Sequence, residues 1–160
     1  MNQDTTLDEY SIDYKEAQNQ SFEMKKRRLF TQIVGGAFNS FNYYHANMDE
    51  LVYEAGLVIE LEQKGLLVHR QEEFPIYYKG LPTPVKRRMD IVVSDRELGH
   101  VILELKAIDY VSDTNRKQLW SYMKLMHCRF GMLINFSPKG VYSENWEMSL
   151  ETGDITRVMQ

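Results

Sequence analysis

The run HVILELKA at residues 100–107 places two charged side chains inside an otherwise apolar segment that is typical of a buried strand. Because side chains alternate along a strand, Glu104 and Lys106 share one face with Ile102, whereas positions 101, 103, 105 and 107 form a wholly apolar opposite face. A carboxylate and an ammonium inside a sheet are costly unless they are paired or bind a cation. The chain must therefore fold around a sheet that compensates these two charges.

A third charged residue, Asp90, lies in a preceding apolar segment that we expect to form a strand at residues 89–93. Neighbouring strands lie about 4.8 Å apart, so Asp90 can approach Glu104 if the register allows it. Two adjacent carboxylates repel each other unless a cation joins them, and Mg²⁺ prefers oxygen ligands of this kind, with the backbone carbonyl of Leu105 as a third.

Such an ion would activate a water for attack on a phosphate, while Lys106 would orient that water or stabilise the transition state. A structural salt bridge between Glu104 and Lys106 or its neighbours accounts equally well for the same pattern. Strand geometry alone therefore leaves both interpretations open.

A helix is predicted from about Asp49, as its N-cap, to Lys64, with Gly65 ending it. Its first turns carry Glu50 and Glu54, which are four residues apart and in line with the leucines at positions 57 and 61. Like charges at this spacing repel, although the helix dipole favours anions near its start, and a nearby cation would relieve the repulsion. Ordinary helix-start chemistry is the alternative explanation.

Another helix is expected from about Thr114 to His127, capped by Asp113. Gln118 and Tyr122 lie four residues apart and share one of its faces. This pair can hydrogen-bond a phosphate or a metal-bound water, but both residue types are also ordinary on a half-exposed helix.

The remaining segments complete a single domain, expected at residues 21–160. The pattern predicts a helix from Phe22 to about Ala46, short strands of a hairpin or meander at 66–68 and 74–78, a buried strand at 129–136 and short edge strands after it. Strands 89–93 and 100–107 should occupy the sheet centre, and Gly80, Pro82 and Pro84 should act as breakers. This order predicts an α/β or α+β fold with a central mixed sheet flanked by helices.

Residues 1–20 combine acidic and amide side chains with few aliphatic ones, so they cannot offset the entropy lost on ordering. We expect them to form a flexible or partner-dependent tail. The same N terminus lacks the pattern of a signal peptide, and no apolar run is long enough to cross a bilayer. We therefore expect an intracellular protein, cytoplasmic or in a nuclear or viral compartment, that is not secreted and does not bind membranes.

The sequence also excludes several site chemistries. The four histidines lack zinc-ligand spacing, Cys128 has no second cysteine to pair with, and Gly35-Gly36 lies in a helical pattern rather than after a strand. We expect no zinc, nucleotide-cofactor or Ser/Cys nucleophile site. The net charge of −4 argues against coating nucleic acid through overall charge, but the basic runs 25–28 and 86–88 leave room for a local basic groove.

Taken together, Asp90, Glu104-Leu-Lys106 and Gln118-Leu-Trp-Ser-Tyr122 resemble the D…ExK…QxxxY series of RecB-like and lambda-exonuclease-like members of the PD-(D/E)XK superfamily. The segments NMDELVYE at 47–54, RMD at 88–90 and ILELK at 102–106 resemble the small GxxExxY proteins of that superfamily. The similarity spans about residues 36–136. The chain departs from the naming motif at Asn47, where the family has glycine, but Asn tolerates the same left-handed conformation.

The resemblance implies a PD-(D/E)XK, restriction-endonuclease-like fold and a nuclease that requires Mg²⁺ or Mn²⁺. It implies metal ligands at Asp90, Glu104, the Leu105 carbonyl and Glu54, and a catalytic set of Asp90, Glu104, Lys106 and Glu50. Either Glu50 or Glu54 would correspond to the helical acid of the family. The expected substrate is nucleic acid, DNA before RNA, contacted by Gln118, Tyr122, Lys86, Arg87 and Arg88.

The alternative is a catalytically inactive nuclease-fold protein that acts as a nucleic-acid-binding or protein-assembly module. Such a protein would contact another copy or a protein partner through the N-terminal tail and the aromatic pair Tyr43 and Tyr44. The same two tyrosines could equally be core or capping side chains.

Overall fold

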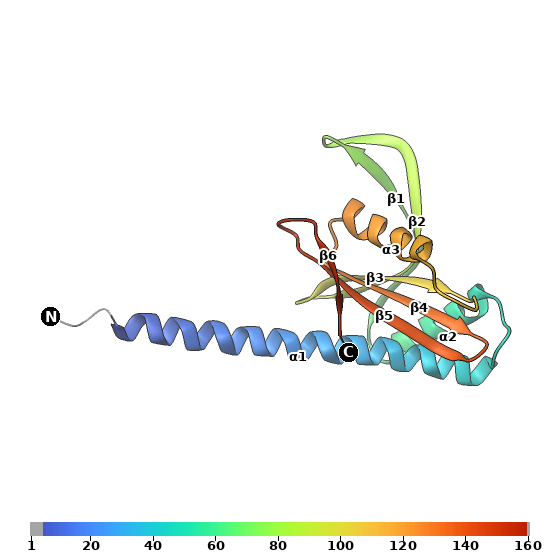
Figure 1. Ribbon diagram of the computed structural model, residues 1–160, viewed down its shortest axis with the longest axis horizontal. Helices are drawn as coiled ribbons and strands as arrows, with labels where there is room; N and C mark the ends of the chain where they lie inside the picture. Colours follow the sequence, from blue (N-terminus) through green and yellow to red (C-terminus); the bar gives the residue numbers. More distant parts are fainter. Residues whose placement is uncertain (1–4, 160) are drawn as a thin grey trace.

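The computed structural model describes the backbone of residues 5–159 and the side chains of residues 15–159. It contains three helices and six strands within these residues (Figure 1). In chain order they are α1 (Thr5–Tyr44), α2 (Glu50–Gln63), β1 (Leu67–Tyr78), β2 (Leu81–Asp95), β3 (Gly99–Lys106), α3 (Asp113–Leu125), β4 (Phe130–Ser137), β5 (Gly140–Met148) and β6 (Ile155–Val158).

The strands form one mixed sheet in which the spatial order follows the chain order, β1-β2-β3-β4-β5-β6. Only β3 and β4 are parallel, because α3 carries the chain back across the sheet between them; every other pair is antiparallel. β3 and β4 occupy the sheet centre. The predicted α+β fold with a mixed sheet flanked by helices is therefore confirmed.

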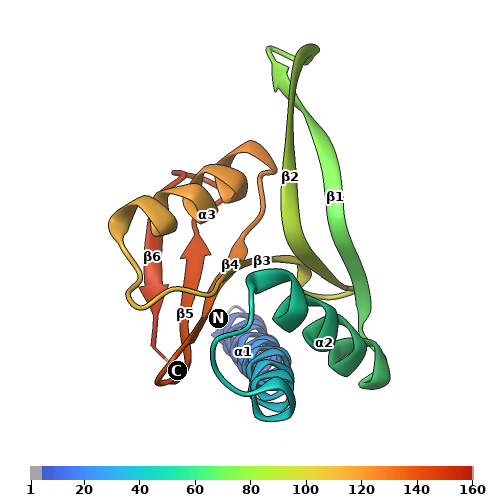
Figure 2. The ribbon, with the colours of Figure 1, turned by 90° about the vertical axis from the view of Figure 1, so that its right-hand side faces the viewer.

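Helices cover both faces of the sheet (Figure 2). α1 and α2 pack on one face around Ile33, Leu57 and Leu103, and α3 packs on the other around Ile102, Leu119 and Leu133. The alternation predicted for residues 101–106 is thus observed: positions 101, 103 and 105 join the first cluster, while Ile102 joins the second. The face that carries Glu104 is the face beneath α3.

α1 begins at Thr5, well before the start predicted at Phe22, and continues through the segment expected to be a tail. The side chains of residues 15–21 are exposed, and this part of the helix projects away from the sheet (Figure 1). Residues 1–4 lie outside the described part of the chain. The helix predicted from Phe22 therefore starts earlier than expected, whereas the mobility of residues 1–20 and any partner of this segment stay predictions.

Two glycines let α1 and α2 approach closely. A Cβ at Gly36 would lie 3.1 Å from Leu57 Cδ1, and one at Gly56 would lie 2.4 Å from Ser40 Oγ. Gly36 therefore belongs to the contact between α1 and α2, and the helical pattern predicted around Gly35 and Gly36 is observed. The start of α2 is as predicted, because the Asp49 side chain accepts a hydrogen bond from Val52 N.

The turn before α2 also has the expected backbone. Asn47 has a φ of 70°, the left-handed conformation in which asparagine replaces the glycine of the resembling motif.

The hairpin of β1 and β2 is longer than predicted and extends beyond the rest of the sheet as an arm (Figure 2). Gly80 forms its turn, but Pro82 and Pro84 lie within β2 rather than breaking it. Prolines are tolerated there because each strand of the two-stranded outer arm has one unpaired edge. The prediction of short strands with breakers at these prolines is therefore wrong.

The C-terminal half agrees closely with the predicted elements. α3 begins one residue earlier than predicted, with Ser112 rather than Asp113 as its N-cap. β4 corresponds to the buried strand expected at 129–136. Cys128 is buried, as expected of a lone structural thiol. Within residues 5–159 no helix combines the length and hydrophobicity needed to cross a membrane.

Candidate active site

Asp90 and Glu104 lie close together at the end of the β2–β3 ladder. In the antiparallel pair of β2 and β3, Val92 lies opposite Ile102, and both pack in the cluster on the α3 side. The antiparallel ladder ends with Ile91 opposite Leu103, and Asp90 and Glu104 come next on the two strands, within electrostatic reach of each other. Asp90 Oδ2 accepts a hydrogen bond from the backbone N–H of Leu105 at 2.8 Å, which fixes its carboxylate against the end of β3.

The Glu104 carboxylate is almost completely buried, with 1% of the residue exposed. Its Oε1 accepts a hydrogen bond from Lys106 Nζ, but its Oε2 is buried without any hydrogen-bond partner. Burial, and next the negative charge of Asp90, raise the pKa of Glu104 to about 7. An acceptor oxygen with unused lone pairs therefore points into the protein between charged neighbours.

Lys106 supplies the positive charge of this group. Burial would lower the pKa of Lys106, but the hydrogen bond to Glu104 and the charges of Glu104, Glu50 and Asp90 outweigh it and raise that pKa. Lys106 is therefore a fixed cation between two strands and the start of a helix.

α2 contributes two acids that have different surroundings. Glu50, in its first turn, lies within electrostatic reach of Lys106 and Asp90, and burial together with the charge of Asp90 raises its pKa despite Lys106. Glu54 is fully buried, and its two oxygens accept hydrogen bonds from Arg70 Nε at 2.5 Å and Gln71 Nε2 at 2.6 Å. Of the two predicted helical acids, Glu50 lies near Lys106 and Asp90. Glu54 instead accepts its hydrogen bonds from Arg70 and Gln71 on β1.

The residues present fit a divalent ion on one specific ground, the unpartnered oxygen of Glu104. Oxygen donors suit Mg²⁺ and Mn²⁺, and a buried carboxylate oxygen without a protein donor is costly unless a cation or water meets it. Asp90 and the Leu105 carbonyl are the neighbouring oxygen donors on the same strand ends. Among the described side chains, no group of three or more His, Cys, Asp or Glu is already gathered tightly enough to hold an ion alone.

α3 holds the predicted accessory pair above this face. Gln118 Nε2 donates to the Tyr122 hydroxyl at 3.3 Å, and the Tyr122 ring contacts Phe74 edge-on. Gly131 lets α3 lie close to β4, because a Cβ there would lie 2.6 Å from Met123 Sδ. The pair thus comes from the helix that covers Glu104, with Gln118 exposed and Tyr122 buried.

The predicted basic residues lie on β2 shortly before Asp90. Lys86, Arg87 and Arg88 are all exposed, and Arg88 is near enough to oppose the rise in the Asp90 pKa that burial causes.

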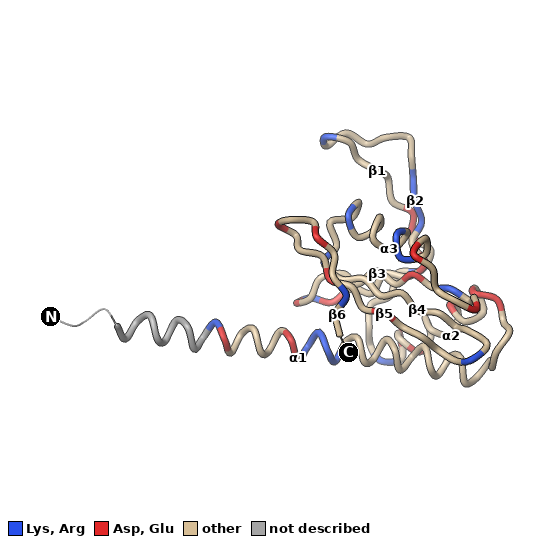
Figure 3. Tube along the Cα trace, viewed as in Figure 1, with Lys and Arg blue, Asp and Glu red and all other residues tan. Residues whose placement is uncertain are grey.

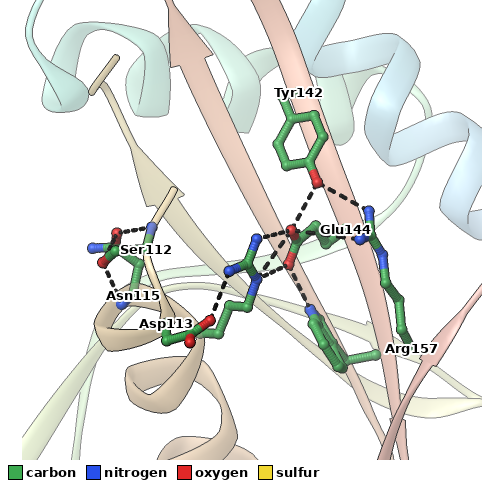
Figure 4. A network of polar contacts seen from close by, with 8 residues as sticks. Ser112, Asp113, Asn115, Tyr142, Glu144 and Arg157 are labelled. Carbon is green, nitrogen blue, oxygen red and sulfur yellow. Dashed lines mark hydrogen bonds and ion pairs between the residues drawn. The ribbon is translucent and has the colours of Figure 1, made fainter. Parts of the chain in front are cut away.

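A third buried carboxylate, Glu144 on β5, was not predicted from the sequence. It accepts hydrogen bonds from the Arg116 guanidinium, from the Tyr142 hydroxyl at 2.8 Å and from Trp146 Nε1 at 3.2 Å (Figure 4). Arg116 also pairs with Asp113, so the network ties the start of α3 to the sheet. The available signal was an acid alternating with Tyr142 and Trp146 on one strand face, in a segment predicted only as short edge strands.

Neighbouring strands of the mixed sheet thus bring Asp90, Glu104 and Lys106 within electrostatic reach of one another. A family profile described as the PD-(D/E)XK nuclease superfamily matches residues 27–147, most of the chain. This chain belongs to the PD-(D/E)XK nuclease superfamily. The match includes α2, β2, β3 and α3, and membership of the GxxExxY group stays a prediction.

One similar solved structure is titled "Crystal structure of SSO0001", with 19% sequence identity and a TM-score of 0.48. The similarity covers 64% of this chain and 53% of that chain, so this chain spans about half the length of the solved protein. No curated protein matches the chain.

Proposed function

We propose that this protein hydrolyses phosphodiester bonds in nucleic acid, DNA before RNA, with Mg²⁺ or Mn²⁺ as cofactor. The observation that carries the proposal is the buried Glu104 oxygen without a partner, beside Asp90 and Lys106. Membership of a superfamily of nucleases supports the same class of reaction.

Asp90, Glu104 and the carbonyl of Leu105 would hold the ion, and Glu50 would approach it from the first turn of α2. A bound divalent ion supplies an acidified water and neutralises charge that develops on the phosphate. Glu54 was predicted as a ligand, but its bonds to Arg70 and Gln71 favour a structural role. We therefore assign the helical acid to Glu50.

Lys106 would contact the substrate, in addition to stabilising the fold through Glu104. Its ammonium already lies at the edge of the carboxylate pair, where it can donate to a phosphate oxygen or orient the attacking water. Lys86, Arg87 and Arg88 would contact the backbone of the incoming strand, and Gln118 and Tyr122 would position the phosphate from α3.

Cleavage of labelled DNA and RNA tests the proposal, with Mg²⁺, with Mn²⁺ and with a chelator. Glu104→Gln and Lys106→Ala should each reduce the rate by about 100-fold or more, because each removes a group that meets the reacting phosphate or its ion. Glu62→Gln, at an exposed position of α2, is the matched control and should keep the wild-type rate. Unchanged products from both site variants would reject the assigned site.

A binding or assembly protein without catalysis is the second candidate. It is favoured by the fact that Asp90 and Glu104 each already have one protein donor, Leu105 N–H and Lys106, so the group is partly compensated without an ion. Under that function the same substrates would bind but no metal-dependent product would form. An assembly role through the N-terminal segment or Tyr43 and Tyr44 would appear as a change in oligomeric state when those residues are altered.

A further inference from the structure

The outer arm of the β1–β2 hairpin carries exposed aromatic side chains that nothing in the fold uses. Tyr77, Tyr78 and Leu81 at its tip are 61%, 66% and 71% exposed. The arm extends beyond the body of the domain (Figure 2). Large rings at the end of a two-stranded arm are not stabilised by burial in the fold, and neighbouring exposed apolar side chains of this kind are typical of an interaction site.

The same arm concentrates positive charge. Residues 74–89 contain four basic residues and no acidic one, in a chain whose net charge is −4. These residues are Lys79 at the turn and Lys86, Arg87 and Arg88 on β2, and Figure 3 shows both positions as blue segments of the arm. None of the four forms a close ion pair within the described residues, and Lys79 Nζ lies 5.4 Å from the Tyr78 ring centroid.

We propose that this arm binds single-stranded nucleic acid and guides it to Asp90, an inference that rests on the proposed nuclease function and names its substrate class. A cationic strand favours a polyanion: Lys86, Arg87 and Arg88 lie just before Asp90 on β2, although Glu73 lies opposite Arg88 on β1. Exposed tyrosines stack on base faces, which an unpaired strand offers along its length and a duplex offers only at its ends. Paired tyrosines beside lysine and arginine therefore favour the single strand.

The geometry also sets the extent of the contact. β2 runs from Leu81 at the tip to Asp90 in the site, which at about 3.3 Å per residue spans roughly 30 Å. The tyrosines would therefore hold the strand about nine phosphates or fewer from the scissile bond. Oligonucleotides too short to reach the tip should lose the contribution of the tyrosines.

Fluorescence anisotropy of a labelled oligothymidylate of about 20 nucleotides, and of a duplex of the same length, tests this inference on the full chain. The double variant Tyr77→Ala/Tyr78→Ala should weaken binding of the single strand by about tenfold or more, from loss of stacking. Ile59→Ala is the control, because Ile59 is an apolar residue that is 53% exposed on α2, outside the arm. Thermal unfolding verifies that each variant folds as the wild type does.

Wild-type affinity in the double variant would overturn the inference, as would a duplex bound as tightly as the single strand with the same dependence on the tyrosines. The two proposals can fail separately. If the protein cleaves nucleic acid with metal but the double variant binds the single strand as the wild type does, the nuclease function is supported and the proposed role of the arm is rejected. If the double variant binds the single strand more weakly but the wild type cleaves no substrate, the arm is supported as a single-strand-binding element and the nuclease function is rejected.

Discussion

Glu104 and Glu54 are both buried acids near the same strands, but their oxygens have different partners. Both Glu54 oxygens accept hydrogen bonds from β1 residues, whereas one Glu104 oxygen has no partner. A buried carboxylate with two donors stabilises the fold, while one with an unused oxygen costs stability until something binds it. At the scale of residues, this difference separates the acid to which we assign a structural role from the acid that we propose binds the ion.

Arg70→Met should therefore destabilise the protein, because it leaves the fully buried Glu54 with only Gln71 as a donor. Since Arg70 is itself partly exposed, we expect a loss of about 2 kcal/mol in the free energy of unfolding rather than the full cost of breaking a buried pair. Urea denaturation measures the loss. Lys64→Met, which breaks the surface pair with Glu60, should cost less than about 0.5 kcal/mol and serves as the control. Equal losses in the two variants would contradict a structural role for Glu54.

The carboxylate of Glu144 makes stability depend on pH. Burial alone would raise its pKa, but hydrogen bonds from Arg116 and Tyr142 and the charges of Arg116 and Arg157 outweigh it and lower that pKa. A lowered pKa in the folded state means that its contribution is present above the unfolded value, near 4.5, and is lost as the pH falls through the folded value. The stability advantage of the wild type over Glu144→Gln should thus be largest near neutral pH and shrink below pH 4.5. A pH-independent difference between the two proteins in urea titrations would refute this.

At the scale of elements, the contact between α1 and α2 determines where Glu50 lies. Gly56→Ala should destabilise the protein by about 1–3 kcal/mol, because the added methyl would displace Ser40 Oγ from its hydrogen bond to Tyr53 O. Gly35→Ala is the control on α1, where nothing lies within 4 Å of the added atom, and it should stabilise the helix by up to about 1 kcal/mol. Thermal unfolding measures both. A neutral Gly56→Ala would mean that the two helices can separate freely.

The sequence predicted the elements whose pattern is local. Alternation along residues 100–107 placed Glu104 and Lys106 on one face, and the adjoining strand in the chain is also its neighbour in the sheet, so Asp90 could be placed beside them. Helical spacing placed Gln118 and Tyr122 on one side of α3. These predictions needed no knowledge of distant contacts.

The remaining features depend on register between distant segments. Arg70 meets Glu54 from another element, and Arg116 meets Glu144 across 28 residues, so neither pair leaves a periodic signal. The length of the β1–β2 arm was missed because its outer residues bury no core face, and hydrophobic periodicity is the signal that marks a strand. The composition of residues 1–20 predicted a tail, whereas the helix α1, which packs on the sheet further along, already begins at Thr5.

At the scale of the whole molecule, the domain is expected to be stable without its N-terminal extension. Side chains of residues 15–21 are exposed, and the packed part of α1 begins at Phe22. Deleting residues 1–20 should change the midpoint of urea denaturation little, because residues 15–20 are exposed and the sequence of residues 1–20 has few aliphatic side chains. A large loss of stability would show that the extension packs on the domain. Sedimentation of both proteins would in addition test association through this segment.

At this scale, the structure combines the projecting arm with its basic residues (Figure 2), the helix α3 on the sheet face that carries Glu104, and the charged group of Asp90, Glu104 and Lys106. The most direct test of this account is a crystal structure of the full chain soaked in Mn²⁺, with anomalous diffraction data. The account predicts an anomalous peak within bonding distance of Asp90 and Glu104, next to Lys106. Well-ordered carboxylates with no such peak, at Mn²⁺ concentrations that support cleavage, would contradict it.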